Sequence, residues 1–186
     1  KRLLEFDDVM NSQREVVYAK RRHALYGDKL ALDLNNMIYD FAEDLVNTFR
    51  DQDDFEGLQQ ELLRHAAMDQ PFTESEFKTG KEEMLVQQLF EAINEHYHHK
   101  NEVQRQRAYP VITSIRADNG GQIKNLGVPF TDGHIQMNVT VDFAKALETE
   151  ARELFRAFER FAVLHVIDEE WKEHLRMLDD LKQEVY

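Results

Sequence analysis

The 186-residue sequence contains no cysteine, and this absence excludes several kinds of protein at once. Without cysteine there is no disulfide scaffold, no thiolate nucleophile and no cysteine-ligated zinc site, and the composition fits a reducing compartment. No apolar run approaches the ~18 residues that a membrane-spanning helix needs, and the N-terminal residues lack the apolar core of a signal peptide. We therefore expect a soluble, cytoplasmic protein.

Basic residues are also scarce. The sequence has 23 Lys and Arg against 36 Asp and Glu, which gives a formal net charge of −13. Residues 28–95 carry −12 of this charge, whereas residues 1–27 carry +2 and residues 96–186 carry −3. An acidic surface repels a phosphate backbone, so the basic cluster Lys20-Arg21-Arg22 is better explained as a solvated helix face. We expect no nucleic-acid partner.

Glycine and proline are rare, with seven and three residues, and apolar residues recur at helical spacing along most of the chain. The spacing predicts helices from about residue 3 to 26, from about 28 to 50, between 55 and 70, and from about 81 to 107. Thr73 and Glu76 have the spacing of a capping box. After Asp142, a favourable N-cap residue, residues 143–186 contain neither glycine nor proline, which predicts one continuous helix.

The hydrophobic period changes from about 3.6 to 2 near residue 109, which is typical of a change from helix to strand. The run VITSIRA, residues 111–117, is rich in β-branched residues, and IQMNVTVD, residues 135–142, alternates between apolar and polar side chains. Four of the seven glycines and two of the three prolines lie within residues 108–142. We expect a small antiparallel sheet of two or three strands there, with a helix or another strand covering its apolar face.

No motif for catalysis or cofactor binding stands out. The Gly80-Lys81 pair lacks the flanking residues of a phosphate-binding loop, and no serine lies in a G-x-S-x-G motif. His96 and His99 share a helix face, but no carboxylate accompanies them as in H-E-x-x-H, which favours a His-rich polar helix over a metal site. We expect no catalytic, cofactor-binding or metal-binding residue in this chain.

Charged residues near the C-terminus have the spacing of ordinary helix-surface pairs. His165 with Glu169 and Asp168 with Lys172 are each four residues apart, which is the spacing of neighbours on one helix face. Trp171, the only tryptophan, is interpreted as a core or interface aromatic. Because the chain begins without methionine and ends within a helical pattern, we also expect it to be a fragment of a longer protein.

Two long stretches resemble the SecA family, the motor ATPases of bacterial protein export. LLEFDDVMNSQREVVYAKRR, residues 3–22, is similar to the pattern L-E-Y-D-D-V-x-N-x-Q-R-x-x-I-Y at the start of the family's helical scaffold. ERFAVLHVIDEEWKEHLRMLDDLKQEV, residues 159–185, resembles the segment that returns to the scaffold and forms the first arm of the two-helix finger. FEGLQQELLRHAAM, residues 55–68, is similar in layout to the helical wing, so the resemblance covers nearly the whole chain.

The sequence departs from the family pattern in three places. Phe6 replaces the usual tyrosine, and Leu178 stands where methionine is common. The β insert at about residues 108–142 is absent from the shorter family members, so its role is not inherited from them.

The resemblance implies a mainly α fold of long scaffold helices plus a helical wing, with the small antiparallel β insert. It implies three regions: the first part of the scaffold at 1–40, the wing with its insert at 41–145, and the scaffold return with the first finger arm at 146–186. The implied scaffold and domain-contact residues are Phe6, Asp7, Asp8, Asn11, Gln13, Arg14 and Tyr18. The implied finger-arm residues are Asp168, Trp171, His174, Leu175, Asp179 and Leu181.

The resemblance implies that this chain couples the ATPase domains of a protein-export motor to movement of the preprotein through the translocation channel. The chemistry would take place outside this chain. The full-length protein would be an ATPase that uses ATP and Mg²⁺ and associates peripherally with the inner face of the cell membrane. The partners would be the nucleotide-binding and preprotein-crosslinking domains of the same protein, the translocation channel and the preprotein. The alternative is a free-standing helical module that binds a partner helix along residues 154–185. If the first interpretation is right, the two ends of the chain should pack together and Trp171 should be partly exposed.

Overall fold

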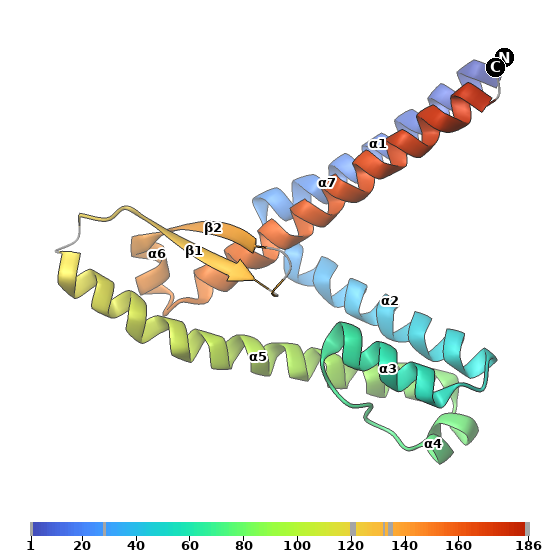
Figure 1. Ribbon diagram of the computed structural model, residues 1–186, viewed down its shortest axis with the longest axis horizontal. Coiled ribbons are helices and arrows are strands. Elements are labelled where there is room, and N and C mark those ends of the chain that lie inside the picture. Colours follow the sequence, from blue (N-terminus) through green and yellow to red (C-terminus); the bar gives the residue numbers. More distant parts are fainter. Residues whose placement is uncertain (1, 28, 120–121, 132, 134–135, 185–186) are drawn as a thin grey trace. The chain divides into compact units, whose positions relative to one another are not determined.

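The structure is a computed structural model that describes residues 2–27, 29–119, 122–131, 133 and 136–184, with side chains for 8–27, 29–118, 122–131, 133 and 136–182. Its elements, shown in Figure 1, are α1 (Arg2–Tyr26), α2 (Leu30–Asp51), α3 (Phe55–Ala66), α4 (Glu74–Thr79), α5 (Glu82–Asn119), β1 (Asn125–Thr131), β2 (Gln136–Asp142), α6 (Phe143–Glu148) and α7 (Arg152–Glu184). The predicted fold class, mainly α with a small antiparallel sheet, is confirmed. The chain divides into unit 1, residues 1–30 and 107–186, and unit 2, residues 31–106.

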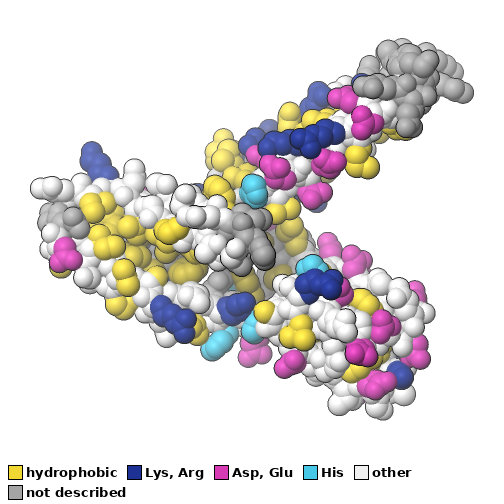
Figure 2. All heavy atoms as spheres, in the orientation of Figure 1, with side chains coloured by type: hydrophobic (Ala, Val, Ile, Leu, Met, Phe, Trp, Pro, Cys, Tyr) yellow, Lys and Arg dark blue, Asp and Glu magenta, His cyan; other side chains and the backbone are white. Residues whose placement is uncertain are grey.

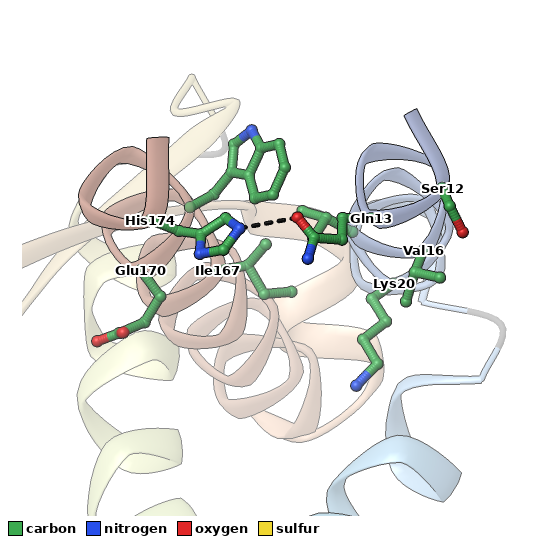
Figure 3. Close-up of a pocket in the computed structure, with 9 residues that line it drawn as sticks. Ser12, Gln13, Val16, Lys20, Ile167, Glu170 and His174 are labelled. Carbon is green, nitrogen blue, oxygen red and sulfur yellow. Dashed lines mark hydrogen bonds between the residues drawn. The ribbon is translucent and has the colours of Figure 1, made fainter. Parts of the chain in front are cut away.

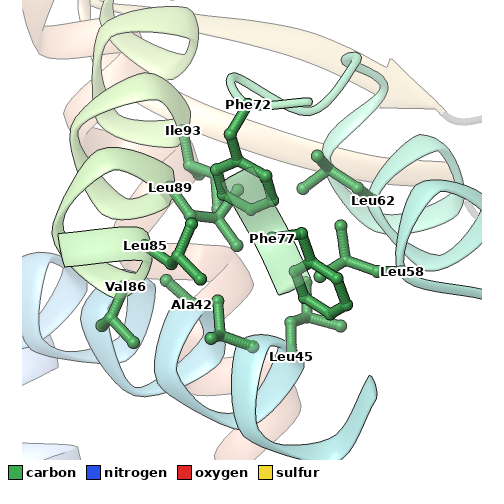
Figure 4. Close-up of a cluster of buried hydrophobic side chains, with 11 residues drawn as sticks. Ala42, Leu45, Leu58, Leu62, Phe72, Phe77, Leu85, Val86, Leu89 and Ile93 are labelled. Carbon is green, nitrogen blue, oxygen red and sulfur yellow. The ribbon is translucent and has the colours of Figure 1, made fainter. Parts of the chain in front are cut away.

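Unit 2 is a small helical domain with its own hydrophobic core. Phe77, which belongs to the short helix α4, is 1% exposed. Apolar side chains at helical spacing on α2, α3 and α5 surround it (Figure 4). The ring of Phe72 stacks on that of Phe77 with 6.1 Å between the ring centroids. The buried members of this core are Ala42, Leu45, Val46, Leu58, Leu62, Phe72, Phe77, Leu85, Val86, Leu89 and Ile93.

The start of α4 contains the capping box that the sequence predicts. The Thr73 hydroxyl accepts a hydrogen bond from the Glu76 backbone N–H at 3.3 Å, and the Glu76 carboxylate accepts one from the Thr73 backbone N–H at 2.7 Å. These two bonds satisfy donors that the first turn of a helix leaves free. They fix the start of α4 and so place Phe77 in the core of unit 2.

Unit 1 contains the two terminal helices, the sheet and the short helix α6. Strands β1 and β2 pair antiparallel, with Val128 opposite Val139 and Phe130 opposite Met137. Alternate residues face inward, as the period of two predicts, and the inner face packs on helices. The expectation that a helix covers the apolar face is confirmed, because Phe130 stacks on Phe158 of α7 with 4.5 Å between ring centroids.

The strand predicted at residues 111–117 is wrong, because these residues continue α5. β-branched side chains favour strands, yet Ala108, Ile112 and Ile115 recur at the spacing of one helix face. All three pack in the core of unit 1, where Ile112 is 3% exposed, so tertiary packing outweighs local β-propensity. Among the described residues, the sheet therefore has two strands and begins only after α5 has ended.

The single helix predicted from residue 143 to the C-terminus is also wrong, because α6 ends at Glu148 and α7 begins at Arg152. Asp142 is the N-cap of α6, as predicted, and its side chain accepts a hydrogen bond from the Lys145 backbone N–H at 2.9 Å. The break lets apolar residues of α6 and of early α7, Ala146 and Leu154, enter the same buried cluster. Figure 1 shows α6 and the start of α7 pointing in different directions.

Candidate functional site

The candidate site is the hairpin formed by α1 and α7, the helices from the two ends of the sequence. These helices lie side by side and run antiparallel (Figure 1). Residues later in α1 contact residues earlier in α7, since Gln13 contacts His174 and Arg21 contacts Asp168. The prediction that residues 1–26 pack against the C-terminal segment is therefore confirmed. Val17 of α1 and Leu164 of α7, which belong to the apolar stripes of these helices, are both half-buried.

Polar contacts between described side chains connect the helices across their interface. Nε2 of His174 lies 2.9 Å from Oε1 of Gln13, and the amide oxygen accepts this hydrogen bond. The Arg21 guanidinium binds the Asp168 carboxylate through two contacts, Nε to Oδ1 at 2.9 Å and Nη2 to Oδ2 at 3.1 Å. A bidentate arginine–carboxylate pair fixes orientation as well as distance. Together, the two contacts define one register between α1 and α7.

A groove runs between the helices beside the first of these contacts. Its volume is about 550 Å³, and Figure 3 shows Gln13, Val16 and Lys20 from α1 facing Ile167 and His174 from α7. Trp171 lines it as well, and its indole stacks on the His174 ring with 5.4 Å between centroids. The complete lining is Ser12, Gln13, Val16, Val17, Lys20, Ile167, Glu170, Trp171 and His174.

The groove walls are mostly hydrocarbon and are open to solvent. Val16 is 56% exposed, and Trp171 is only half-buried, so the prediction of a partly exposed tryptophan is confirmed. Lys20 and Glu170 place one positive and one negative charge at the rim. This arrangement is that of a contact surface, because an apolar floor with polar edges suits packing against another protein surface.

The C-terminal end of α1 meets α7 through Arg160. Gly27 follows α1 with φ of +75°, a left-handed conformation that suits glycine, and its N–H binds the His23 carbonyl at 2.8 Å. A Cβ at Gly27 would lie 3.9 Å from Nη2 of Arg160. The guanidinium also contacts the Glu153 carboxylate at 3.5 Å. A cation at this place interacts favourably with the negative end of the α1 helix dipole.

The structure brings together only some of the residues that the resemblance implies. Gln13, His174 and Trp171 meet at the groove, and Asp168 meets Arg21 next to it. The remaining side chains do not join this group: Asp8, Asn11, Arg14, Tyr18, Asp179 and Leu181 are exposed, and Leu175 is half-buried. Within α1, Arg14 donates a hydrogen bond to Asn11 at 3.4 Å. Phe6 and Asp7 lie in α1, but their side chains are outside the described residues.

Arg21 is the main site residue that sequence reasoning missed. Asp168 was expected to pair with Lys172 on the helix surface, whereas it binds Arg21, and Lys172 binds Glu169 at 2.7 Å. That hydrogen bond from Lys172 lowers the pKa of the exposed Glu169 below its ordinary value. No local signal distinguishes Arg21 from its basic neighbours, because its partner is 147 positions away.

The arrangement of α1 and α7 offers contact and positioning. Among the described side chains, no group of three or more His, Cys, Asp or Glu could hold a metal ion. No described helix is long and apolar enough to cross a membrane. Figure 2 shows basic and acidic side chains along the α1–α7 hairpin, and mainly acidic ones over unit 2.

Comparison with known proteins identifies relatives over the whole chain. The family described as "SecA Wing and Scaffold domain" matches residues 1–186. Proteins named "Protein translocase subunit SecA" from Parabacteroides distasonis, Bacteroides thetaiotaomicron and Christiangramia forsetii are 45%, 45% and 42% identical over 185 residues. The alignment covers 100% of this chain but 16% of each relative. No solved structure matches the chain.

Proposed function

Because the chain belongs to the SecA family, whose wing and scaffold domain it matches from end to end, we propose that it is the coupling part of a protein-export motor. In this role α1 and α7 form a two-helix rod that connects ATPase domains elsewhere in the full-length protein with the preprotein. The observation that carries the proposal is the pair of contacts Gln13–His174 and Arg21–Asp168, which holds helices from the two ends of the chain in one register.

A rod suits this task for a physical reason. Residues 152–184 form one helix without glycine or proline, and such a helix moves as a unit instead of absorbing displacement by bending. The contacts to α1 prevent one helix from sliding along the other. We propose that movement at one end of the hairpin therefore reaches the other end.

The groove is the proposed contact surface for another domain of the full-length protein. Candidate domains are the nucleotide-binding and preprotein-crosslinking domains, while the finger arm that begins in α7 acts on the preprotein at the translocation channel. ATP and Mg²⁺ would bind in those other domains, since this sequence contains no phosphate-binding loop. The full-length protein would work in the cytoplasm and at the inner face of the cell membrane.

The regions 1–40, 41–145 and 146–186 remain the proposed scaffold start, wing and scaffold return. The match over all 186 residues to a wing and scaffold domain favours this function over a free-standing interaction module.

Replacement of Trp171 by alanine in the full-length protein tests the proposal. Removing the indole takes away the largest apolar side chain of the groove, so preprotein translocated per ATP hydrolysed should fall several-fold. Met177→Ala is the control, because Met177 is also on α7, is 63% exposed and does not line the groove. Equal ratios for wild type, Trp171→Ala and Met177→Ala would contradict a coupling role for the groove.

A further inference from the structure

The chain between α6 and α7 stops a helix with residues that normally continue one. Glu150 has φ of +51° and Ala151 has φ of +69°, so two consecutive non-glycine residues are left-handed. Glycine takes this conformation without steric cost and is the usual residue after a helix C-cap. Glutamate and alanine are instead among the better helix formers. Local preference and observed conformation therefore disagree at both positions.

A small set of hydrogen bonds makes this stop. Ala151 N–H binds the Ala146 carbonyl at 2.7 Å, and Glu150 N–H binds the Leu147 carbonyl at 3.1 Å, the two bonds of a Schellman motif. The Thr149 hydroxyl donates a hydrogen bond to the Lys145 carbonyl at 2.7 Å and accepts one from the Glu153 backbone N–H of α7 at 3.0 Å.

Burial is what favours the bent form over a straight helix. Phe143, Ala146 and Ala151 are each at most 1% exposed and pack in one cluster with Val141 of the sheet. A continuous helix would withdraw Phe143 and Ala146 from this cluster. It would also restore ordinary helical hydrogen bonds and relieve both left-handed residues.

We propose that residues 149–151 are a two-state hinge, and that in the second state α6 and α7 become one continuous helix. Straightening adds the nine residues 143–151 to α7 and lengthens it by about 13 Å. In the proposed function, the hinge would allow the rod formed by α1 and α7 to change its length. This role of the hinge rests on the proposed function. The conformational change itself depends only on residues of this chain.

Distance measurement by electron paramagnetic resonance in the full-length protein tests the hinge. Spin labels at Ala144 on α6 and Val166 on α7, both exposed, would be about 33 Å apart along a continuous helix and closer in the bent form. Labels at Arg156 and Met177, both exposed and within α7, should stay about 32 Å apart in either state and serve as the control.

Substitutions at the hinge should shift the two populations in opposite directions. Glu150→Gly with Ala151→Gly should reduce the 33 Å population, roughly fivefold for each glycine, because glycine favours the left-handed conformation. Thr149→Ala should increase it by removing the side-chain bonds at the stop. The glycine variant favours the folded, bent structure, so it should remain folded.

Two results would overturn the hinge. One is a single short distance between residues 144 and 166 without nucleotide, with ADP and with a non-hydrolysable ATP analogue. The other is a long-distance population that the two glycines leave unchanged. Two populations that respond to the glycines but ignore nucleotide would contradict the proposed coupling function and leave the hinge in place.

Discussion

His174 of α7 hydrogen-bonds Gln13 of α1 at 2.9 Å, although the two residues are 161 positions apart in the sequence. The bond is partly buried at the groove, where the His174 ring also stacks on Trp171. It therefore connects the two ends of the chain and positions an aromatic side chain of the proposed contact surface.

The first prediction concerns the energy of this bond. A double-mutant cycle with Gln13→Ala and His174→Ala should give a coupling of about 1 kcal/mol in the free energy of unfolding, the net worth of a typical hydrogen bond. The same cycle with Asn11→Ala in place of Gln13→Ala should give a coupling near zero, because Asn11 is exposed and contacts Arg14 of its own helix. Chemical denaturation measures all the variants, and equal couplings in both cycles would contradict the register.

The second prediction compares adjacent valines on α1. Val17 is half-buried, so Val17→Asp should lower the free energy of unfolding by roughly 2 kcal/mol through a poorly hydrated charge. Val16 is 56% exposed, and Val16→Asp should change the stability by about 0.5 kcal/mol or less. If denaturant midpoints for the two variants coincide, the face of α1 that packs on α7 has been assigned incorrectly.

The third prediction concerns the core of unit 2. Leu62 is fully buried and Leu63 is 56% exposed, so the two neighbours form a matched pair. Leu62→Ala should cost about 3 kcal/mol by leaving a cavity, whereas Leu63→Ala should cost well under about 1 kcal/mol. Thermal or chemical unfolding distinguishes them, and similar losses would mean that α3 presents a different face to the core.

The fourth prediction concerns pH and the capping box of α4. Hydrogen bonds from the backbone N–H and then the hydroxyl of Thr73 hold the pKa of Glu76 below its ordinary value of 4.5. The carboxylate's contribution to stability is thus complete above pH 4.5 and is lost as the pH falls through the lower, folded-state pKa. The glutamine in Glu76→Gln cannot titrate. The stability of this variant relative to wild type should therefore rise as the pH is lowered from 6 to 3.

Removal of the partner provides the control for this pH effect. In a Thr73→Ala background the hydroxyl bond to Glu76 is absent but the larger backbone bond remains, so Glu76→Gln should alter the pH profile somewhat less than it does in wild type. Parallel pH profiles for wild type and Glu76→Gln would show that the carboxylate does not cap α4 in solution.

Local patterns predicted much of the fold because they depend on neighbouring residues. The helical stripe of residues 3–26, the capping box at Thr73 and the alternation in β2 all appear in the structure. The two errors occur where tertiary packing decides between states. Ile112 lies in a helix because the helix face that carries it is buried. Ala151 lies in the break between two helices because it packs with Ala146 in the core.

The site was predictable in outline but not in its contacts. Helical spacing identified the two terminal stripes, and the family resemblance pointed to Gln13, His174 and Trp171. The partner of Asp168 depends on the register between α1 and α7, which no spacing within either helix determines. For this reason Arg21 was overlooked and Lys172 was expected in its place.

Charge reversal of Arg21 and Asp168 in the full-length protein tests the central claim most directly. The pair is exposed, so either single substitution should cost little stability while repulsion disturbs the register between α1 and α7. Arg21→Glu and Asp168→Arg should each lower preprotein translocated per ATP hydrolysed several-fold, and the double variant should restore most of the ratio. Arg176→Glu, which disturbs the pair with Glu173 within α7, is the control. Single variants that behave like this control, or a folded double variant no better than the singles, would contradict coupling through the α1–α7 hairpin.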